Sequence, residues 1–435
     1  MKVLLICNST KGGAGGAAYR LYQNLQGMGV HVQMLTQNKE VDDDAVMVAP
    51  KSKLVKLVRA LERLLPNQTL DHLPLSFYPH RDRATFSLQW VPDALASKVA
   101  QLGPDVVNLH WICNGMLRIE TLSKLQKPIV WTLHDMWAFT GGCHLSDDCD
   151  RYTDACGACP RLKSSKDLDL SRWVWRRKSR AWKDFNLTLV TPSSWLAKCA
   201  RSSSLFKNAR IEVIPNGIDI ARFKPIDRQV AREWLNWPHK KKIVLFGAWE
   251  NNYRKGFHLL QPALQSLSKS GWQDKVEVVV FGFSQPSPRP DLGFKSHYLG
   301  RLSDDISLAL AYAAADVFVA PSLQDNLPTT VMEAIACGTP CVAFNIGGMA
   351  DLIEHQQNGY LAQPYQVEDL ARGIAWVLED GNRYQRLSQR ARQKAEQEFA
   401  LELFARRYQA LFSEMSNDIK SEFCNEKRTA TKKGL

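Results

Sequence analysis

Short runs of apolar residues alternate along the chain with longer segments whose apolar positions recur at helical spacing. The first run, KVLLICN (2–8), is followed by a glycine-rich segment, a helical pattern over 17–29 and a second run, VHVQMLT (30–36). Short apolar runs predict buried strands, and recurrence every three to four residues predicts an amphipathic helix. This order of elements predicts a βαβ unit, and therefore a parallel sheet with right-handed crossovers.

The alternation continues in two series, and the second begins after VIPNGIDIARFKP (213–225). Later runs of the first series are DVVNLHW (105–111), PIVWTLHD (128–135) and LTLVTPS (187–193), and those of the second are KKIVLFG (241–247), KVEVVVFGF (275–283), DVFVAPS (316–322) and TPCVAF (339–344). Helical patterns lie between them, and the long segment 382–415 is helical by composition and periodicity.

The pattern predicts an α/β protein with two doubly wound, Rossmann-like domains, which we place at 1–210 and 211–395. We expect a helix over 396–418 to pack back towards the N-terminal domain, and the basic tail 419–435 to be disordered. Ligands of open parallel sheets bind beyond the carboxyl ends of the strands. The loops that follow the strands are therefore where we expect chemistry.

The amino-acid composition indicates which broad class of protein the chain belongs to. With 435 residues, 45% of them hydrophobic and 23% charged, the chain has the make-up of an ordinary globular protein with large cores. It has no apolar run long enough for a transmembrane helix, and its first residues lack the apolar core of a signal peptide. These features predict a cytoplasmic protein, and the formal charge of +12 favours polyanionic partners.

One basic segment leaves two interpretations open. KSKLVKLVRALERLL (51–65) places leucines and a valine on one stripe with lysines and arginines around it. Such a helix suits an anionic lipid surface, which would put the protein peripherally on the inner face of the cytoplasmic membrane. A helix that faces a core, with its cations solvated, has the same pattern. SRWVWRRKSRAWKDF (171–185) adds tryptophans and further cations.

Two loops at predicted strand ends carry residues that suit a phosphate. The glycines of 11–21, among them Gly15 and Gly16, would let a backbone approach a ligand at a helix N-terminus; a tight turn alone is the alternative. Arg254 and Lys255 follow a strand that ends at Gly247 and precede a helix. Arginine offers a fork and lysine a point charge to a diphosphate, whereas a solvated basic turn needs neither.

The segment PSLQDNLPTTVMEAIACGTPCVAF (321–344) combines two acids with a helix start. Asp325 lies in the loop after a buried strand, and Glu333 follows eight residues later in a helix of small residues. Asn326 and Leu327 leave backbone N–H groups near the start of that helix. A carboxylate that faces a ligand can accept two hydroxyl hydrogen bonds, as a ribose diol requires. A structural loop acid and a half-buried structural glutamate are the alternatives.

With this segment the chain resembles retaining glycosyltransferase family 4, which has the GT-B fold. The resemblance is carried by Asp325–Pro340, where the family has Glu, seven residues and Glu before Gly-x-Pro, by VIPNGIDIARFKP (213–225), by RKGF (254–257), by VTPSSWLAKCA (190–200) and by the N-terminal glycines. TLHDMWAFTGGCH (132–144) and CGACP (156–160) are similar to enzymes of bacterial exopolysaccharide and colanic-acid-type biosynthesis. The resemblance extends from residue 1 to about residue 415.

The resemblance implies residue roles. Glu333 would bind the nucleotide ribose and Asp325 the transferred sugar, with Asn326 and Leu327 also at the donor. Arg254 and Lys255 would hold the diphosphate, Gly15 and Gly16 would lie against it from the other domain, and His134 would face the sugar and the reaction centre. The catalytic set is thus His134, Asp325 and Glu333. The chain departs from the family where Asp325 replaces a glutamate, and where Ala248 stands in place of a phosphate-binding arginine.

The resemblance also implies a fold, partners and a reaction. The two domains of a GT-B protein face each other across a cleft, with the acceptor on the N-terminal and the nucleotide sugar on the C-terminal side. The implied activity is transfer of a sugar from a nucleotide-diphosphate-sugar to a glycan or polyprenyl-diphosphate-linked acceptor, with retention of configuration. Catalysis would need no metal or other cofactor, and the setting would be cell-surface polysaccharide biosynthesis.

Four of the ten cysteines are clustered within one short segment of the sequence. Cys143, Cys149, Cys156 and Cys159 form C-x5-C-x6-C-x2-C, and four thiolates could close a tetrahedral structural zinc site, with His144 able to replace one ligand. Free thiols and disulfides are the alternatives, although disulfides are rare in a reducing cytosol. We expect the cluster to brace the loop after His134. The scattered Cys7, Cys113, Cys337 and Cys341 lie in apolar segments and are expected in cores.

Two other function classes each fit part of the sequence. A nicotinamide-dependent oxidoreductase could use two Rossmann-like domains, but no acidic residue ends the second strand to bind a ribose. A basic nucleic-acid-binding protein would account for the charge, but the basic residues are dispersed and no DNA- or RNA-binding module is visible, so we expect no nucleic-acid partner.

Overall fold

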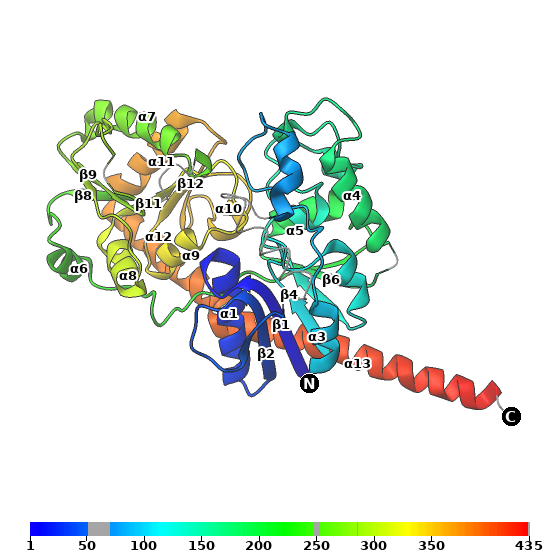
Figure 1. Cartoon of the computed structure of the whole chain (residues 1–435). Coiled ribbons are helices and arrows are strands. Elements are labelled where there is room, and N and C mark those ends of the chain that lie inside the picture. Colours follow the sequence, from blue (N-terminus) through cyan, green and yellow to red (C-terminus); the bar gives the residue numbers. More distant parts are fainter. Residues whose placement is uncertain (51–69, 184, 248–252, 285, 434–435) are drawn as a thin grey trace. The chain divides into compact units, whose positions relative to one another are not determined.

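The structure is a computed structural model that describes the chain except residues 51–69, 184, 248–252, 285 and 434–435. It divides into two compact units, unit 1 (Met1–Ile214 and Phe404–Leu435) and unit 2 (Pro215–Leu403). We expected the boundary after residue 210, and the chain passes from one unit to the other after Ile214. Each unit contains one parallel sheet, as the alternation of apolar runs predicts (Figure 1).

Unit 1 is built on a seven-stranded sheet with the order β3-β2-β1-β4-β5-β6-β7, all of whose pairs are parallel. The strand order reverses beside β1, between β1 and β4, which is where open α/β sheets place ligands. The strands are β1 (Lys2–Ser9), β2 (His31–Asn38), β3 (Val46–Val48), β4 (Val106–Leu109), β5 (Ile129–Thr132), β6 (Leu187–Thr191) and β7 (Arg210–Val213).

Helices cover this sheet, and several begin at side-chain caps. The Asp169 carboxylate accepts from the backbone N–H groups of Ser171 and Arg172 at the start of α4, and Ser193 caps α5 in the same way. The α-helices are α1 (Gly12–Gly27), which lies beside β1 and β2, α3 (Leu95–Leu102), α4 (Leu170–Ala181) and α5 (Ser194–Ser202) (Figure 1). The short helices are η1 (Leu70–Phe77), η2 (Ile119–Lys124), η3 (Trp137–Phe139), η4 (Arg151–Thr153) and η5 (Pro160–Leu162).

The C-terminal part of the chain differs from the expectation in two ways. The helical segment 382–415 is interrupted at Ala400, whose neighbours Phe399 and Leu401 hydrogen-bond to the backbone of Ile218. The following helix, α13 (Leu401–Lys433), continues through most of the tail that composition marks as disordered. Glutamate, lysine, arginine and alanine in that tail favour a helix. The last turns of α13 extend beyond the rest of unit 1 (Figure 1).

Unit 2 is built on a six-stranded parallel sheet with the order β10-β9-β8-β11-β12-β13. Its strands are β8 (Lys242–Gly247), β9 (Val276–Phe281), β10 (Ser296–Tyr298), β11 (Val317–Ala320), β12 (Cys341–Phe344) and β13 (Gly359–Ala362). Its helices are α6 (Arg228–Leu235), η6 (Tyr253–Lys255), α7 (Phe257–Leu267), η7 (Ser268–Trp272), α8 (Asp305–Ala314), α9 (Thr329–Ala336), α10 (Met349–Leu352), α11 (Val367–Glu379), α12 (Gly381–Lys394) and η8 (Ala395–Phe399).

The central strands β4, β5, β6, β9, β11 and β12 are buried along their whole length. This burial explains why they read as continuous apolar runs without alternation. The expectation that Cys7, Cys113, Cys337 and Cys341 are core residues is confirmed, because all four are buried. Across the described part of the chain, no helix combines the length and apolarity needed to cross a bilayer.

Candidate functional site

The loops after the strands of unit 2 bring three of the predicted residues together. The Lys255 ammonium donates to Asp325 Oδ2 over 2.7 Å, and Arg254 Nη1 lies 3.2 Å from the same oxygen. Arg254 also donates to the carbonyl of Gln324 over 2.8 Å. Burial alone would raise the pKa of Asp325, but the charges of Lys255 and Arg254 hold it below its usual value. Asp325 is therefore ionised between two cations.

Two glycines make this close approach of loops feasible. Gly256 has φ +75°, and a Cβ atom there would lie 1.8 Å from the carbonyl oxygen of Pro321. Gly347 has φ +54°, and a Cβ there would lie 2.0 Å from the carbonyl oxygen of Asp325. Both conformations are ones that L side chains rarely adopt. The Asp325 loop is thus held between two backbone segments at the carboxyl end of β11.

Glu333 lies on α9, eight residues after Asp325 and directly behind its loop. It is half-buried, and its Oε2 accepts a hydrogen bond of 2.8 Å from Tyr312 Oη on α8. Burial raises the pKa of Tyr312 well above its usual value, so the phenol stays a donor. Asn326 and Leu327 are buried just before Pro328, the N-cap of α9. The hydrogen bond from Tyr312 thereby orients the second acid.

In unit 1 the predicted His134 follows β5 and is paired with a second histidine after β4. His110 Nδ1 lies 2.9 Å from His134 Nε2, and the two rings stack with centroids 5.2 Å apart. His110 Nε2 lies 2.8 Å from Asn108 Oδ1. Burial lowers the pKa of His134 to about 4, with Asp135 opposing and Arg20 adding to the effect, and burial lowers that of His110 well below its usual value. Both rings are therefore neutral near pH 7.

A buried polar chain continues behind these histidines. Asn108 Nδ2 donates to the carbonyl of Val130 over 3.0 Å and to Thr132 Oγ1 over 3.1 Å. Thr132 Oγ1 lies 2.8 Å from Tyr408 Oη, which comes from α13. The C-terminal helix thus contributes a hydroxyl to the network that reaches His134.

Asp135 and His144 join the loop after His134 to the segment that contains Ser87. His144 Nδ1 lies 2.6 Å from Asp135 Oδ2, and its Nε2 lies 2.9 Å from Ser87 Oγ. Asp135 Oδ2 also accepts from Trp111 Nε1 over 2.7 Å. Ser87 is fully buried, so this Ser–His–Asp arrangement has no access for a substrate and serves to connect loops.

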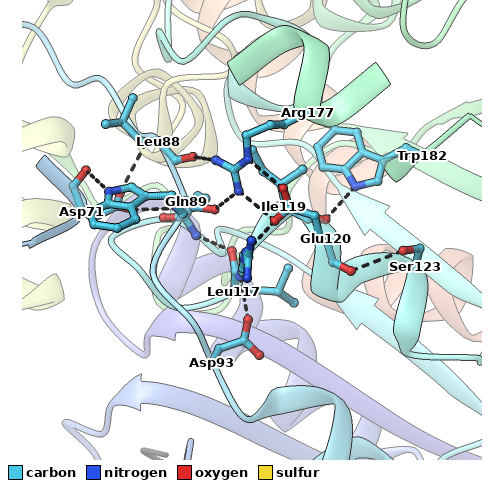
Figure 2. A network of polar contacts seen from close by, with 12 residues as sticks. Asp71, Leu88, Gln89, Asp93, Leu117, Ile119, Glu120, Ser123, Arg177 and Trp182 are labelled. Carbon is cyan, nitrogen blue, oxygen red and sulfur yellow. Dashed lines mark hydrogen bonds and ion pairs between the residues drawn. The ribbon is translucent and has the colours of Figure 1, made fainter. Parts of the chain in front are cut away.

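A second network fixes the segment that follows His110 (Figure 2). The Arg177 guanidinium on α4 donates to both carboxylate oxygens of Glu120 and to the carbonyls of Leu88 and Gln89. The Gln89 side chain in turn donates to the carbonyls of Ile112 and Leu117, over 2.7 and 2.6 Å. These hydrogen bonds join α4, the Gln89 segment and the 112–117 turn, and so hold that turn in place.

Gly15 and Gly16 lie inside a helix, whereas we expected them in a loop. Helix α1 begins at Gly12, so both glycines are in its first turns. Gly15 packs so closely on β1 that a Cβ would lie 2.5 Å from the carbonyl oxygen of Ser9. This packing, gained on folding, outweighs the helix-weakening effect of glycine. Gly15 is thus required by helix–strand contact, and a ligand role for the two glycines stays a prediction.

The four clustered cysteines share one region but do not form a ligand set. Among the described residues, no group of three or more His, Cys, Asp or Glu side chains is arranged to hold a metal ion. The sequence offered His144 as an alternative ligand, and here its two ring nitrogens contact Asp135 and Ser87. Cys156 Sγ accepts from the Gly141 N–H over 3.1 Å. Structural zinc remains a prediction from the spacing.

The basic segment 171–185 lies mostly on α4, and two of its cations face inward. Arg177 binds Glu120, and the fully buried Lys178 donates to the carbonyls of Trp137 and Thr140. These two cations are therefore not available to a membrane. The segment 51–65 and the departure at Ala248 lie outside the described residues.

Five of the predicted residues lie in loops that follow strands or on the helix after such a loop: Arg254, Lys255, Asp325, Glu333 and His134. Their functional roles stay predictions. The sequence prediction did not include His110, Asn108 or Tyr312. The sequence does contain a signal for His110, because the same Leu-His pair ends two neighbouring strands: Asn-Leu-His at β4 and Thr-Leu-His at β5.

Two family profiles match adjacent parts of the sequence. Residues 11–222 match Glycosyltransferase Family 4, and residues 227–394 match Glycosyl transferases group 1. The first match ends eight residues after Ile214, where the first segment of unit 1 ends, and the second begins twelve residues after Pro215, where unit 2 begins.

Curated relatives resemble parts of the chain. A colanic acid biosynthesis glycosyl transferase of Escherichia coli K12, WcaC, is 26% identical over 58% of this chain and 62% of its own length. The N,N'-diacetylbacillosaminyl-diphospho-undecaprenol alpha-1,3-N-acetylgalactosaminyltransferase of Campylobacter jejuni is 28% identical over 51% of this chain and 59% of its own length. The chain thus spans less than two thirds of these relatives.

Solved structures resemble the chain over nearly its whole length. Sucrose-phosphate synthase from Thermosynechococcus elongatus has a TM-score of 0.66 at 20% identity, covering 95% of this chain and 98% of its own. The Anabaena protein HepE, solved with UDP and glucose, has a TM-score of 0.63 at 19% identity, covering 95% and 100%. At this identity the likeness establishes the fold, which is GT-B. The chain belongs to the family 4, group 1 glycosyltransferases.

Proposed function

We propose that the protein is a retaining glycosyltransferase that moves a sugar from a nucleotide-diphosphate-sugar to a glycan or polyprenyl-diphosphate-linked acceptor. Its setting would be cell-surface polysaccharide biosynthesis at the cytoplasmic face of the membrane. The observation that carries the proposal is the cluster of Arg254, Lys255 and Asp325 at the carboxyl end of β11, with Glu333 oriented behind it by Tyr312. Family membership and the names of relatives with glycan acceptors support it.

The diphosphate would bind where positive charge is concentrated. Lys255 and Arg254 now share one carboxylate oxygen of Asp325, and a diphosphate brings more negative charge than that carboxylate. The N-terminus of α9, which no side chain caps, adds a partial positive charge. These groups would stabilise the negative charge that grows on the departing phosphate oxygen in the transition state. Stabilisation of such charge is usually the largest single contribution to catalysis. No metal is needed for that role.

The two acids would then take separate tasks. Glu333, held by Tyr312 through one oxygen, would accept hydrogen bonds from the ribose hydroxyls. Asp325, released from Lys255 by the diphosphate, would accept from a hydroxyl of the sugar. The acceptor hydroxyl would attack the anomeric carbon from the face that the phosphate leaves, and its proton would pass to the leaving phosphate oxygen. That course retains the configuration.

A panel of nucleotide sugars, screened by thermal shift and then by turnover with a polyprenyl-diphosphate-linked glycan, tests the proposal. Glu333→Ala and Lys255→Ala should each lower kcat/KM by about 100-fold or more while the fold persists. The matched controls are Glu379→Ala and Lys269→Ala, which change exposed residues elsewhere in unit 2. Near-normal turnover by both site variants would contradict the proposal.

A further inference from the structure

A cavity of about 330 Å³ lies in unit 2 at the amino ends of β8 and β11. Two of its lining residues fix that position, because Lys242 is the first residue of β8 and Asp316 directly precedes β11. The loops that contain Lys255 and Asp325 follow the carboxyl ends of the same two strands. A strand of six residues spans about 20 Å, so the cavity is separate from those loops.

One buried carboxylate at the base of the cavity faces three cations. Asp316 is only 1% exposed, and its Oδ2 pairs with Arg232 Nη2 over 2.5 Å. Its Oδ1 pairs with the Arg228 guanidinium, and the Lys242 ammonium lies 3.6 Å from the same oxygen. One carboxylate balances one of these charges, so two positive charges remain in excess and repel each other.

The three cations differ in their access to the cavity. Arg232 is buried, and its guanidinium donates to four backbone carbonyls, those of Ala314, Pro238, His239 and Lys241. These hydrogen bonds hold the segment 238–241, most of which lines one wall. Arg228 and Lys242, in contrast, keep 31% and 38% of their side chains exposed. They can therefore contact a ligand while they remain beside Asp316.

The rest of the lining adds positive charge. Lys240 and His239 are exposed at the rim of the cavity. The second carboxylate, that of Asp227, accepts from the backbone N–H groups of Gln229 and Val230 as the N-cap of α6. Five lysines and arginines thus line the cavity against two aspartates, which gives a net charge of +3 with the histidine neutral.

We propose that this cavity binds a small soluble molecule that carries a phosphate or diphosphate group. A phosphate between Arg228 and Lys242 would accept charge-assisted hydrogen bonds from both and relieve their repulsion. The volume lies at the lower end of the range for small-molecule sites, which suits a compact ligand. Because the carboxylate and Arg232 are buried at the base, the site is recessed, and a free molecule fits it better than a flat lipid surface. The proposal does not depend on the proposed function.

Calorimetric titration of the full chain with inorganic pyrophosphate tests the proposal. The native chain should show a binding event that Lys242→Met weakens by at least about tenfold, the effect of one lost charge-assisted hydrogen bond. The matched control is Lys269→Met, which changes an exposed lysine of unit 2 outside the cavity and should leave this event unchanged. Equal Kd values for the two variants would overturn the proposal, as would a native chain that does not bind pyrophosphate.

Reversal of a charge at the rim gives a second variant that leaves the buried ion pairs intact. Lys240→Glu should weaken the same event by at least about tenfold, whereas Lys269→Glu should not. At 0.15 M salt, exposed charges more than about 8 Å apart are largely screened, so a general effect of net charge is small and the control measures it. Equal Kd values for these two variants would also overturn the proposal.

Lys255→Ala separates this site from the proposed donor site. If Lys255 holds the donor diphosphate, pyrophosphate binds twice, and Lys255→Ala should remove only the event that does not depend on Lys242. Loss of the Lys242-dependent event in Lys255→Ala would overturn the proposal, because one site would then account for both effects. A single event that depends on Lys242 and survives Lys255→Ala would contradict the proposed function and support this site.

Sedimentation with vesicles of phosphatidylcholine and phosphatidic acid distinguishes a soluble phosphate from a lipid headgroup. The native chain, Lys242→Met and Lys269→Met should bind the vesicles to the same extent. Vesicle binding that only Lys242→Met loses would place a lipid headgroup in the cavity, and would overturn the assignment to a soluble ligand.

Discussion

Replacing Gly256 by alanine tests whether the Lys255 loop is held by backbone contact with the Asp325 loop. A Cβ at Gly256 would lie 1.8 Å from the Pro321 carbonyl oxygen and 2.7 Å from its carbon. Ordinary contact between these atom types is above about 3 Å, so one loop must move by more than about 1 Å. Gly271 offers the matched control, because its φ of +86° is similar and nothing lies within 4 Å of its Cβ position.

Comparison of the two variants distinguishes the cost of a left-handed backbone at alanine from the cost of moving a loop. Gly271→Ala carries only the left-handed backbone cost, about 1 kcal/mol or a few degrees in Tm. Gly256→Ala adds the steric conflict and should cost at least about 3 kcal/mol, or about 6–12 °C for a domain of this size.

The displacement of Lys255 should also weaken binding of a nucleoside diphosphate that stabilises the native chain by about tenfold or more, measured by calorimetry at a temperature where both variants are folded. Equal Tm values and equal Kd values for the two alanine variants would refute the reasoning.

Three further predictions concern unit 1. Arg177→Met leaves Glu120 without its buried partner and should lower the free energy of unfolding by about 2–4 kcal/mol. The control Arg118→Met removes an exposed partner of the same carboxylate and should cost less than about 1 kcal/mol. Equal denaturation midpoints for the two variants would contradict this prediction. The unfolded chain binds a proton at His134 near pH 6.5, whereas the folded chain binds it only near pH 4. The free energy of unfolding should therefore fall as the pH drops from 6.5 to 4, by at most about 1.4 kcal/mol per pH unit, and the fall should be shallower in His134→Gln. Identical profiles of stability against pH for the native chain and His134→Gln would contradict this prediction. If the four clustered cysteines bind structural zinc, elemental analysis of chain purified without chelator should give about one zinc ion per chain, and a content near zero would exclude the site.

The apolar runs predicted the architecture well because most strands of both sheets are buried on both faces. The runs missed β3, β7, β10 and β13, which have three or four residues and lie at the outer positions of the sheets. Such short outer strands contain too few apolar residues to stand out, and pairing with a neighbour decides their formation.

The helix start at Gly12 was missed for a related reason. Glycine lowers helix propensity, and only the tertiary contact of Gly15 with Ser9 shows why a glycine is needed inside the helix.

The candidate site was predictable where one local motif holds it, as with Asp325 and Glu333. It was less predictable where distant segments meet. His110 and His134 are brought together by the parallel pairing of β4 with β5, and Tyr408 reaches Thr132 from α13, hundreds of residues later in the chain. Neither contact leaves a local pattern in the sequence.

The most direct measurement is a crystal structure of the full chain with a nucleotide-diphosphate-sugar that stabilises it. The account predicts that the diphosphate binds Arg254 and Lys255, that the Lys255 ammonium leaves Asp325 for a phosphate oxygen, and that the ribose hydroxyls donate to Glu333. A nucleotide bound elsewhere, with the Lys255–Asp325 ion pair intact, would contradict it.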